Sequence, residues 1–315
     1  MLIYILIFIG SFFLIARSGA ILVNSLTYLS RLLGLSEYTI AFILMSFATS
    51  IPEFFIGISS TIQGVPSLSF GNIIGANIIN VLIVIGAVAI FSKEIKIENK
   101  ISRENFWLIS FLAFLPILLV SDGIISRGDG FVLVLAFLIY IWKLMGEKEY
   151  FSKILSGIKF SNENVVKTFN HSWRFFLGVF LLMISSFLLV WSGKIIATDI
   201  NLPLVLFGLI FISLGTALPE LAFGIKASFM DHSSMTLGNA LGSIAFTATF
   251  IVGVMSLIRP IYFVPEFRFT IAVVFLFIGF VLFNFFAYSR SIISRREGFV
   301  LVLVYVVFLA TQYLV

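Results

Sequence analysis

Long apolar stretches separated by short polar segments dominate the pattern of hydrophobic and polar positions along the chain. A helix needs roughly 20 apolar residues to cross a bilayer, and by that measure the pattern predicts ten spans. They lie near residues 2–30, 38–62, 67–92, 105–121, 129–146, 173–195, 202–228, 234–258, 268–288 and 298–315. The fifth span is the weakest, because few apolar residues precede Lys143, whose long side chain can reach the membrane interface. The pattern therefore predicts an all-α membrane protein with ten transmembrane helices.

Polar residues inside these spans recur at a fixed interval. Ser46-Phe-Ala-Thr-Ser-Ile-Pro-Glu53 and Ser213-Leu-Gly-Thr-Ala-Leu-Pro-Glu220 have serine, threonine, proline and glutamate at the same internal spacing. Two further pairs of segments match at the same offset or one position more: Gly71-Asn-Ile-Ile-Gly75 with Gly238-Asn-Ala-Leu-Gly242, and Arg127-Gly-Asp-Gly-Phe131 with Arg295-Arg-Glu-Gly-Phe299. Each half thus holds five spans. Because five is odd, the second half must enter the membrane from the opposite side, which makes an inverted-topology repeat.

This repeat divides the chain into a first five-helix repeat at residues 1–146, a linker at 147–172 and a second five-helix repeat at 173–315. Alternating loops differ in charge: the odd-numbered loops carry 15 Lys and Arg residues and the even-numbered loops carry 4. This bias predicts that the odd-numbered loops and the linker are cytoplasmic and that both termini are extracellular. A net charge of +5 with this distribution indicates membrane orientation rather than nucleic-acid binding.

Composition strengthens the membrane assignment and narrows the chemistry. With 60% hydrophobic and 11% charged residues and a mean hydropathy of +1.15, the chain lies far outside the range of soluble domains. The absence of cysteine excludes disulfides, thiolate metal sites and cysteine nucleophiles. The two histidines, His171 and His232, are expected in loops, so a histidine-rich metal site is excluded as well.

Glu53 is the only ionisable side chain between Tyr38 and Ser92, and a lone carboxylate at membrane depth is a functional-site hypothesis by default. Proline three residues after each threonine removes a backbone N–H, so Pro52 and Pro219 leave two carbonyls without their helical partner. At membrane depth such carbonyls need protein, water or an ion. A structural clamp, in which the two glutamates only hold kinked helices together, is the alternative.

Residues three or four apart share a helix face, which groups the candidate ligands. One face carries Ser46, Thr49, Ser50 and Glu53, and its counterpart carries Ser213, Thr216, Ala217 and Glu220. In the next spans Asn72, Ala76 and Asn80 lie four apart, as do Asn239, Ser243 and Thr247. Asn72 and Asn239 are explained equally well as ligands or as hydrogen-bonding contacts between helices. This all-oxygen set suits Ca²⁺, which takes about 6–8 oxygens, and Na⁺, but not Zn²⁺ or Cu²⁺.

The paired motifs Thr49-Ser-Ile-Pro-Glu53 with Gly71-Asn72, and Thr216-Ala-Leu-Pro-Glu220 with Gly238-Asn239, resemble the alpha-repeats of the calcium/cation antiporter superfamily, in particular those of prokaryotic sodium/calcium exchangers. The resemblance implies a core made of the second, third, seventh and eighth spans, across which the first and sixth slide. It also implies ligand roles: shared carboxylates from Glu53 and Glu220, oxygens from Thr49 and Thr216, backbone carbonyls at Ser46 and Ser213, and completing ligands from Ser50, Asn80 and Ser243.

Three positions depart from the family pattern. Thr247 stands where the family commonly has Asp or Asn, and Ala217 and Ala76 stand where it has Ser. Each change removes an oxygen ligand or a charge, which leaves the number of Na⁺ sites and the coupling ion open. Asn77, beside Ala76, offers an amide in partial compensation. The extra acidic residue of the proton-coupled branch is missing, which argues against Ca²⁺/H⁺ exchange.

The sequence therefore predicts a multi-pass cell-membrane antiporter that exchanges Ca²⁺ for Na⁺ by alternating access at a midplane site. It needs no cofactor, since Ca²⁺ and Na⁺ are its cargo, and its partners are the lipid bilayer and these ions. The inverted repeat lets one chain close the site, so a monomer is sufficient. Ca²⁺/H⁺ or another cation exchange, an intramembrane hydrolase using the two carboxylates, and a non-catalytic scaffold are the alternatives.

Overall fold

The computed structural model describes residues 1–315 except 33–44, 98–102, 146–164, 230–232, 265 and 315. This part of the chain is mostly helical, with short strands in the connections. The elements of the first half are α1 (Leu2–Leu32), α3 (Met45–Thr49), α4 (Ile51–Ile62), α5 (Pro66–Ile79), η2 (Asn80–Val84), α6 (Ile85–Ser92), β1 (Glu94–Lys96), α7 (Arg103–Leu119), η3 (Val120–Asp122), β2 (Ile124–Ile125) and α8 (Arg127–Met145).

The second half begins with α10 (Val165–Asp199). It continues with α11 (Leu204–Phe207), η4 (Gly208–Ile212), α12 (Ser213–Thr216), α13 (Leu218–Phe229), α14 (Ser233–Ala245), η5 (Phe246–Ile251), α15 (Val252–Ile258), β3 (Ile261–Tyr262), α16 (Phe267–Arg290), β4 (Ile292–Ser294) and α17 (Arg295–Leu314). The segments η2, η4 and η5 are wider π-helical turns inside longer helices.

Helices long and apolar enough to cross a membrane number eight in the described part of the chain, two fewer than expected. The expected second span is interrupted after Thr49, and its beginning lies outside the described residues. The expected fifth span, α8, carries three charged residues within its 19 positions. Both segments are helical where they are described.

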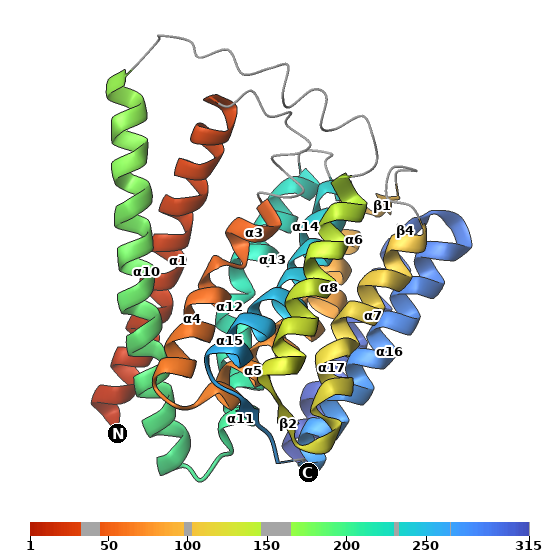
Figure 1. The fold of residues 1–315 in the computed structure, drawn as a ribbon. Helices are drawn as coiled ribbons and strands as arrows, with labels where there is room; N and C mark the ends of the chain where they lie inside the picture. Colours follow the sequence, from red (N-terminus) through yellow and green to blue (C-terminus); the bar gives the residue numbers. More distant parts are fainter. Residues whose placement is uncertain (33–44, 98–102, 146–164, 230–232, 265, 315) are drawn as a thin grey trace.

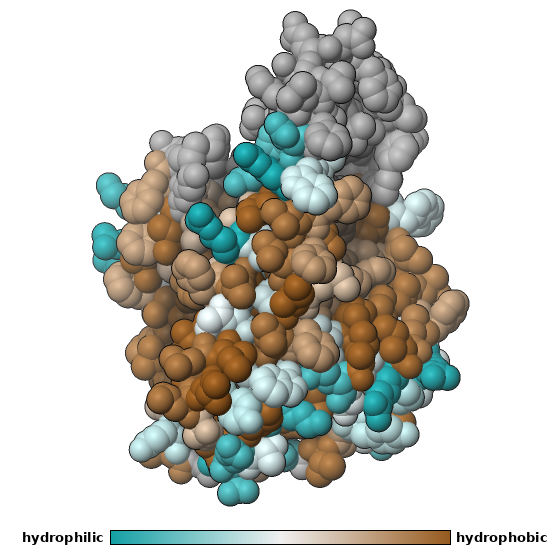
Figure 2. Space-filling view, turned by 90° about the vertical axis from the view of Figure 1, so that its left-hand side faces the viewer, coloured by the Kyte–Doolittle hydropathy of each residue, from teal (hydrophilic) through white to brown (hydrophobic). Residues whose placement is uncertain are grey.

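The surface of the molecule is apolar where a soluble protein would be polar. Figure 2 shows one face on which hydrophobic residues dominate the middle and hydrophilic residues lie toward the upper and lower ends. Large apolar side chains stand exposed along α1 and α10, among them Phe13 at 71% and Phe176 at 66% of full exposure. Since exposing such side chains to water is unfavourable, this surface indicates a lipid environment, and the chain is a multi-pass membrane protein.

Helices α1 and α10 run side by side at one edge of the bundle, and α10 also packs on α4 (Figure 1). Helices α7, α16 and α17 lie toward the opposite edge, with α5, α13 and α14 between the two groups. Both termini lie at the lower end of the view in Figure 1. The bundle therefore has a central group of helices that bears the paired motifs and a peripheral pair, α1 and α10.

Two small antiparallel ladders join the halves of the chain. Strand β1 pairs with β4, with Ile95 opposite Ile293, and strand β2 pairs with β3, with Ile125 opposite Ile261. Each ladder thus takes one strand from each half, and β1 and β4 lie at the upper end of the bundle while β2 lies at the lower end (Figure 1). The strands also follow the internal repeat, since β3 is the counterpart of β1 and β4 is the counterpart of β2 at the offset that relates the paired motifs.

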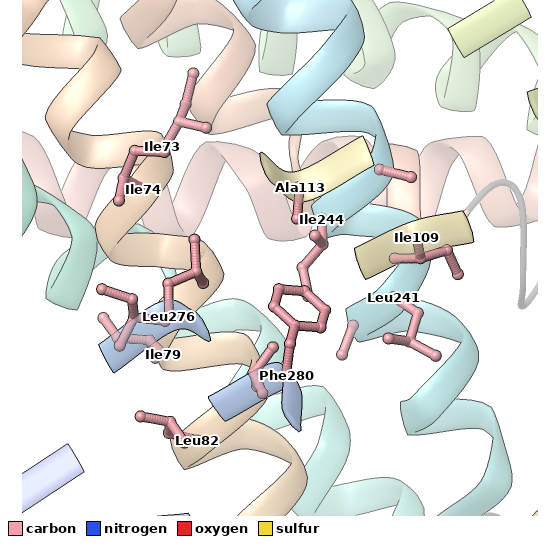
Figure 3. Close-up of a cluster of buried hydrophobic side chains, with 14 of the residues drawn as sticks. Ile73, Ile74, Ile79, Leu82, Ile109, Ala113, Leu241, Ile244, Leu276 and Phe280 are labelled. Carbon is pink, nitrogen blue, oxygen red and sulfur yellow. The ribbon is translucent and has the colours of Figure 1, made fainter. Parts of the chain in front are cut away.

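The core is an apolar cluster among α5, η2, α7, α14 and α16. Figure 3 shows Ile74 and Ile79 from α5, Leu276 and Phe280 from α16, and Ile244 from α14 within it. All five side chains are almost completely buried. Burying a side chain of this size contributes about 1.5–3 kcal/mol relative to exposing it to water, which fixes the helices that carry the polar motifs.

Glycines allow the helices to approach at the backbone level. A Cβ at Gly71 would collide with the carbonyl oxygen of Val205, and a Cβ at Gly208 would collide with that of Leu68. Gly71 thus lies against the first turn of α11, at a position where a side chain would not fit.

The repeated Arg-Gly-Asp-Gly and Arg-Arg-Glu-Gly motifs begin α8 and α17. Asp129 accepts hydrogen bonds from the N–H and Oγ of Ser126 at 2.8 and 2.7 Å, and Glu297 does the same for Ser294 at 2.7 and 2.8 Å. Asp129 is therefore a half-buried helix-capping residue. Its acid stabilises the start of a helix and is not available for chemistry.

The sixth helix is longer than expected. Helix α10 begins at Val165, eight residues before the expected start at residue 173, and His171 lies within it instead of in a loop. Most of the expected linker and His232 lie outside the described residues. The early start has a simple basis, since residues 165–173 contain neither proline nor glycine to end the helix.

Candidate functional site

Two helix breaks create the site. Helix α3 ends at Thr49 and α4 begins at Ile51, and in the same way α12 ends at Thr216 and α13 begins at Leu218. The residues at the breaks have nearly equal backbone angles: Ser50 has φ −89° and ψ 4°, and Ala217 has φ −79° and ψ −5°. The breaks expected from the two prolines are therefore confirmed. Proline is tolerated in the first turn of a new helix, because no partner is needed there for its missing N–H.

Glu53 and Glu220 occupy the first turns of α4 and α13. The positive end of a helix dipole lies at the N-terminus, so each carboxylate sits where the backbone favours negative charge. Each side chain is only 1% exposed. The structure thus buries two acids at two helix starts that occupy equivalent positions in the internal repeat.

The two carboxylates lie close enough for their negative charges to interact directly. In the part of the chain that the structure describes, the only ion pair is Lys96 with Glu94, so neither buried acid has a cationic partner there. Glu53 Oε2 and both carboxylate oxygens of Glu220 are also buried without a hydrogen-bond partner among the described residues. Unpaired buried charges are strongly unfavourable. This arrangement argues against a structural clamp, which would satisfy these oxygens.

Hydroxyl groups surround the acids without completing hydrogen bonds to these oxygens. The hydroxyls of Thr49 and Ser243 lie beside the Glu220 carboxylate, and the Thr216 hydroxyl lies beside that of Glu53. Each acid is thus approached by a threonine from the opposite half of the chain. The threonines and glutamates that the sequence singled out are brought together.

The threonines also tie the two halves to each other. Thr49 Oγ1 donates a hydrogen bond to Asn239 Oδ1 at 3.3 Å, and Thr216 Oγ1 donates one to Asn72 Oδ1 at 3.1 Å. Both asparagines are fully buried, and their Nδ2 groups have no partner among the residues described. The asparagines therefore do contact the opposite half of the chain, while the Nδ2 group of each is buried without a partner among the described residues.

Two other expected ligands, Ser50 and Ser243, contact each other, and a third, Asn80, is buried in the helix that follows α5. Ser50 Oγ lies 2.6 Å from Ser243 Oγ, which makes a third contact between the halves. Asn80, at the start of η2, is buried, and its Oδ1 lacks a partner within the described chain. A π-helical turn displaces the side chains that follow it, and such turns are frequent at functional sites.

Asn77 is a polar residue of this region that sequence reasoning noted only as a compensating amide. It is fully buried, and its Oδ1 accepts a hydrogen bond of 3.0 Å from Thr247 Oγ1 in η5. Thr247 therefore joins the first half through Asn77. The only signal in the sequence is a second asparagine between Asn72 and Asn80 in an otherwise apolar segment.

The expected backbone ligands, the carbonyls of Ser46 and Ser213, face the breaks. Ser46 O accepts hydrogen bonds from Thr49 Oγ1 at 3.3 Å and Ser50 Oγ at 2.8 Å. Ser213 O accepts one from Thr216 Oγ1 at 3.4 Å. Both carbonyls are thus partly engaged by the hydroxyls of their own motif.

A cavity of about 390 Å³ adjoins the motifs. Its walls come from α1 and from both helix breaks, and it is lined by Ala16, Gly19, Ala20, Asn24, Ala48, Thr49, Pro52, Leu218, Pro219, Ala222 and Phe223. Small side chains on α1 face the breaks, and a Cβ at Gly19 would lie only 3.8 Å from Pro52 Cγ. The cavity therefore extends to Thr49, whose hydroxyl lies beside the Glu220 carboxylate.

The chemistry of the site is that of oxygen ligands. The described chain contains no group of three or more His, Cys, Asp or Glu residues that could hold a metal in the usual way. What it offers instead is two carboxylates, several hydroxyls and amides, and carbonyls at helix breaks. Such sets bind hard cations, and their modest number of charges favours reversible binding over permanent retention.

Comparison with known proteins points in the same direction. The family model described as sodium/calcium exchanger protein matches residues 3–146 and 171–314. The putative antiporter CaxA of Alkalimonas amylolytica is 29% identical over 238 residues, which cover 74% of this chain and 73% of that protein. The sodium/calcium exchanger MaX1 of Methanosarcina acetivorans is 25% identical over an alignment of 353 residues that covers 98% of both.

The fold has a counterpart among solved structures. A structure of the sodium-calcium exchanger NCX_Mj, soaked with 2.5 mM Na⁺ and 0.1 mM Ca²⁺, matches with a TM-score of 0.66 and 24% identity over 98% of each chain. Similarity at this level of identity concerns the fold alone.

Proposed function

This chain belongs to the sodium/calcium exchanger family, and from that premise we propose that it exchanges Ca²⁺ for Na⁺ across the membrane by alternating access. As a member of this family it is a cation antiporter and not an enzyme, which removes the hydrolase and scaffold alternatives. The observation that carries the finer proposal is the pair of buried carboxylates, Glu53 and Glu220, with oxygens that have no partner among the described residues.

A bound cation would satisfy these oxygens. Two carboxylates supply a formal charge of −2, which one Ca²⁺ neutralises and which monovalent ions can share. Because the same carboxylates serve either cargo, one ion must leave before the other binds. This competition, combined with access from one side at a time, yields exchange instead of a leak.

The proposed ligand set is the one expected from the sequence. Glu53 and Glu220 bind the cations, Thr49 and Thr216 add oxygens, and the remaining positions complete the sites or position these ligands: Ser46, Ser50, Asn72, Asn80, Ser213, Asn239, Ser243 and Thr247. Three contacts across the halves, from Thr49, Thr216 and Ser50, support the grouping.

The proposed architecture has ten transmembrane helices in two inverted five-helix repeats, residues 1–146 and 173–315, joined by a linker at 147–172. The repeated offset of the helix breaks, the two ladders and the capped starts of α8 and α17 supports this arrangement. The charge bias of the loops supports a cytoplasmic linker and extracellular termini. One chain supplies both glutamates, so a monomer would be sufficient.

Exchange of Ca²⁺ for protons is the alternative, and the same pair of acids favours it. A buried carboxylate without a cation is neutralised just as well by a proton, because the neutral acid costs far less to bury than the ion. Protons would then compete with Ca²⁺ at Glu53 and Glu220.

A flux assay decides between these coupling ions. We expect purified protein in sealed liposomes loaded with Na⁺ to take up labelled Ca²⁺ when the liposomes are diluted into Na⁺-free buffer. Liposomes loaded with K⁺, and liposomes with a pH gradient only, are the controls. Uptake that is indifferent to the Na⁺ gradient would reject Na⁺ coupling, and uptake driven by the pH gradient alone would establish proton exchange.

The cavity beside Thr49 predicts a way to block ion passage. The residues that line it are mostly apolar. Because such residues bind ions weakly, ions can pass through the cavity without being retained. We expect Ala20→Trp, which fills the cavity from α1, to lower the Ca²⁺ uptake rate about tenfold or more. Phe13→Trp on the same helix is the control, since Phe13 is 71% exposed and does not line the cavity. Equal uptake by wild type and Ala20→Trp would show that ions take another route.

A further inference from the structure

The two halves of the candidate site differ in their hydroxyl groups, although Glu53, Thr49 and Asn72 match Glu220, Thr216 and Asn239. At the offset that relates Glu53 to Glu220, Ser50 corresponds to Ala217 and Ser243 corresponds to Ala76. Both alanines are buried, each only 2% exposed. Two hydroxyls present in one part of the site are thus replaced by methyl groups in its counterpart.

The hydroxyls that remain gather around one acid. Ser243 and Thr49 lie beside the Glu220 carboxylate, and Ser50 Oγ contacts Ser243 Oγ at 2.6 Å. Among the described residues, the hydroxyl that acts on the Glu53 carboxylate is that of Thr216. In the internal repeat, Ala217 and Ala76 have the positions relative to Glu53 that Ser50 and Ser243 have relative to Glu220. The side chains of these alanines have no oxygen.

The backbone does not compensate for this loss. Ser50 and Ala217 have almost the same φ and ψ, so the alanine occupies an equivalent position and lacks only the ligand atom. Asn77, the neighbour of Ala76, directs its amide oxygen to Thr247 at 3.0 Å. The amide that sequence reasoning offered as compensation for Ala76 is therefore already engaged with another helix.

We propose that Glu220, Ser243, Ser50 and Thr49 form the only subsite of this symmetric pair that holds a monovalent cation, and that Glu53 lacks the counterpart. A monovalent ion has a single charge to offset the loss of its water, so it needs a full set of oxygens at its site. A divalent ion bridging both carboxylates depends less on these hydroxyls. The chain then moves one Na⁺ fewer per Ca²⁺ than two equivalent halves would move. This inference rests on the proposed Na⁺/Ca²⁺ exchange.

The first test removes the subsite from the full-length protein. We expect Ser243→Ala to raise the Na⁺ concentration for half-maximal thermal stabilisation about tenfold, while that for Ca²⁺ changes by less than about threefold. Ser69→Ala is the matched control, because Ser69 is an equally buried hydroxyl on α5 without a hydrogen-bond partner among the described residues. An unchanged Na⁺ response in a folded Ser243→Ala protein would overturn the proposal.

The second test builds the missing counterpart. We expect Ala76→Ser with Ala217→Ser to shift the reversal potential of Ca²⁺ flux in liposomes to that of a carrier with one more Na⁺ per Ca²⁺. Ala113→Ser, which places a hydroxyl in the apolar cluster of Figure 3, should leave it unchanged. An unchanged reversal potential in the double variant would overturn the proposal. Absence of Na⁺-driven uptake by the wild type would instead reject the proposed function, and the thermal response of Ser243→Ala would still decide the subsite.

Discussion

Replacing either Glu53 or Glu220 by glutamine is expected to abolish Ca²⁺ exchange while the protein still folds and inserts. Glutamine has the shape of glutamate but no charge, so the site would offer one negative charge to a divalent ion. Losing one charged partner of a buried pair costs about 3–5 kcal/mol, which corresponds to a loss of affinity of roughly a hundredfold or more. Ca²⁺ uptake into liposomes and Ca²⁺-dependent thermal stabilisation in detergent measure the two effects.

The direction of the stability change separates this hypothesis from a structural clamp. Both acids are buried without cationic partners in the described chain, so glutamine at either position removes an unfavourable charge. We therefore expect an ion-free melting temperature equal to or above that of the wild type, whereas loss of a clamp would lower it. Glu94→Gln is the control, since its side chain is 46% exposed and pairs only with Lys96. Wild-type uptake by either site variant would refute the assignment.

Gly71→Ala is expected to destabilise the protein more than any other single methyl group added to α5. Its Cβ would collide with the backbone carbonyl of Val205, and a backbone atom cannot rotate out of the way as a side chain can. Overpacking of this kind costs about 1–3 kcal/mol, and more where neither helix can shift. The displacement would also move Asn72, the partner of Thr216, so transport should fall with stability.

The matched control for this prediction is Gly10→Ala. Gly10 lies in α1 with nothing within 4 Å of the added Cβ, and alanine favours a helix over glycine by about 1 kcal/mol. Gly10→Ala should therefore raise the melting temperature in detergent slightly or leave it unchanged. If Gly71→Ala melted at the temperature of the wild type, the close backbone contact between α5 and α11 would be contradicted.

Much of the site could be predicted from sequence because its determinants are local. Pro52 and Pro219 interrupt their helices wherever those helices pack, and a glutamate in the first turn after the break needs no tertiary contact to be placed there. The constant offset between the two halves then brings two equivalent motifs together. The threonine pairings with Asn72 and Asn239 follow that internal repeat, although the sequence does not say which partner each threonine takes.

Other features depend on contacts between distant segments and left little trace in the sequence. Strands β2 and β3 have two residues each, too few for an alternating pattern to be visible, and their pairing joins the two halves of the chain. The bond between Thr247 and Asn77 depends on how η5 and α5 are turned toward each other. The early start of α10 could not be read from hydropathy because its first two turns mix apolar and polar residues, although none of them breaks a helix.

The two ladders constrain how such a molecule can change shape. Each joins a strand before residue 146 to a strand after residue 165, and the ladders sit at opposite ends of the bundle. If the two halves moved apart about a hinge, the hydrogen bonds of both ladders would have to break in every transport cycle. Within the described residues, α1 and α10 lie outside both ladders, and they contact each other far more than they contact the other helices. The two ladders therefore hold the halves together, and α1 and α10 are the helices that can move relative to them without breaking a ladder.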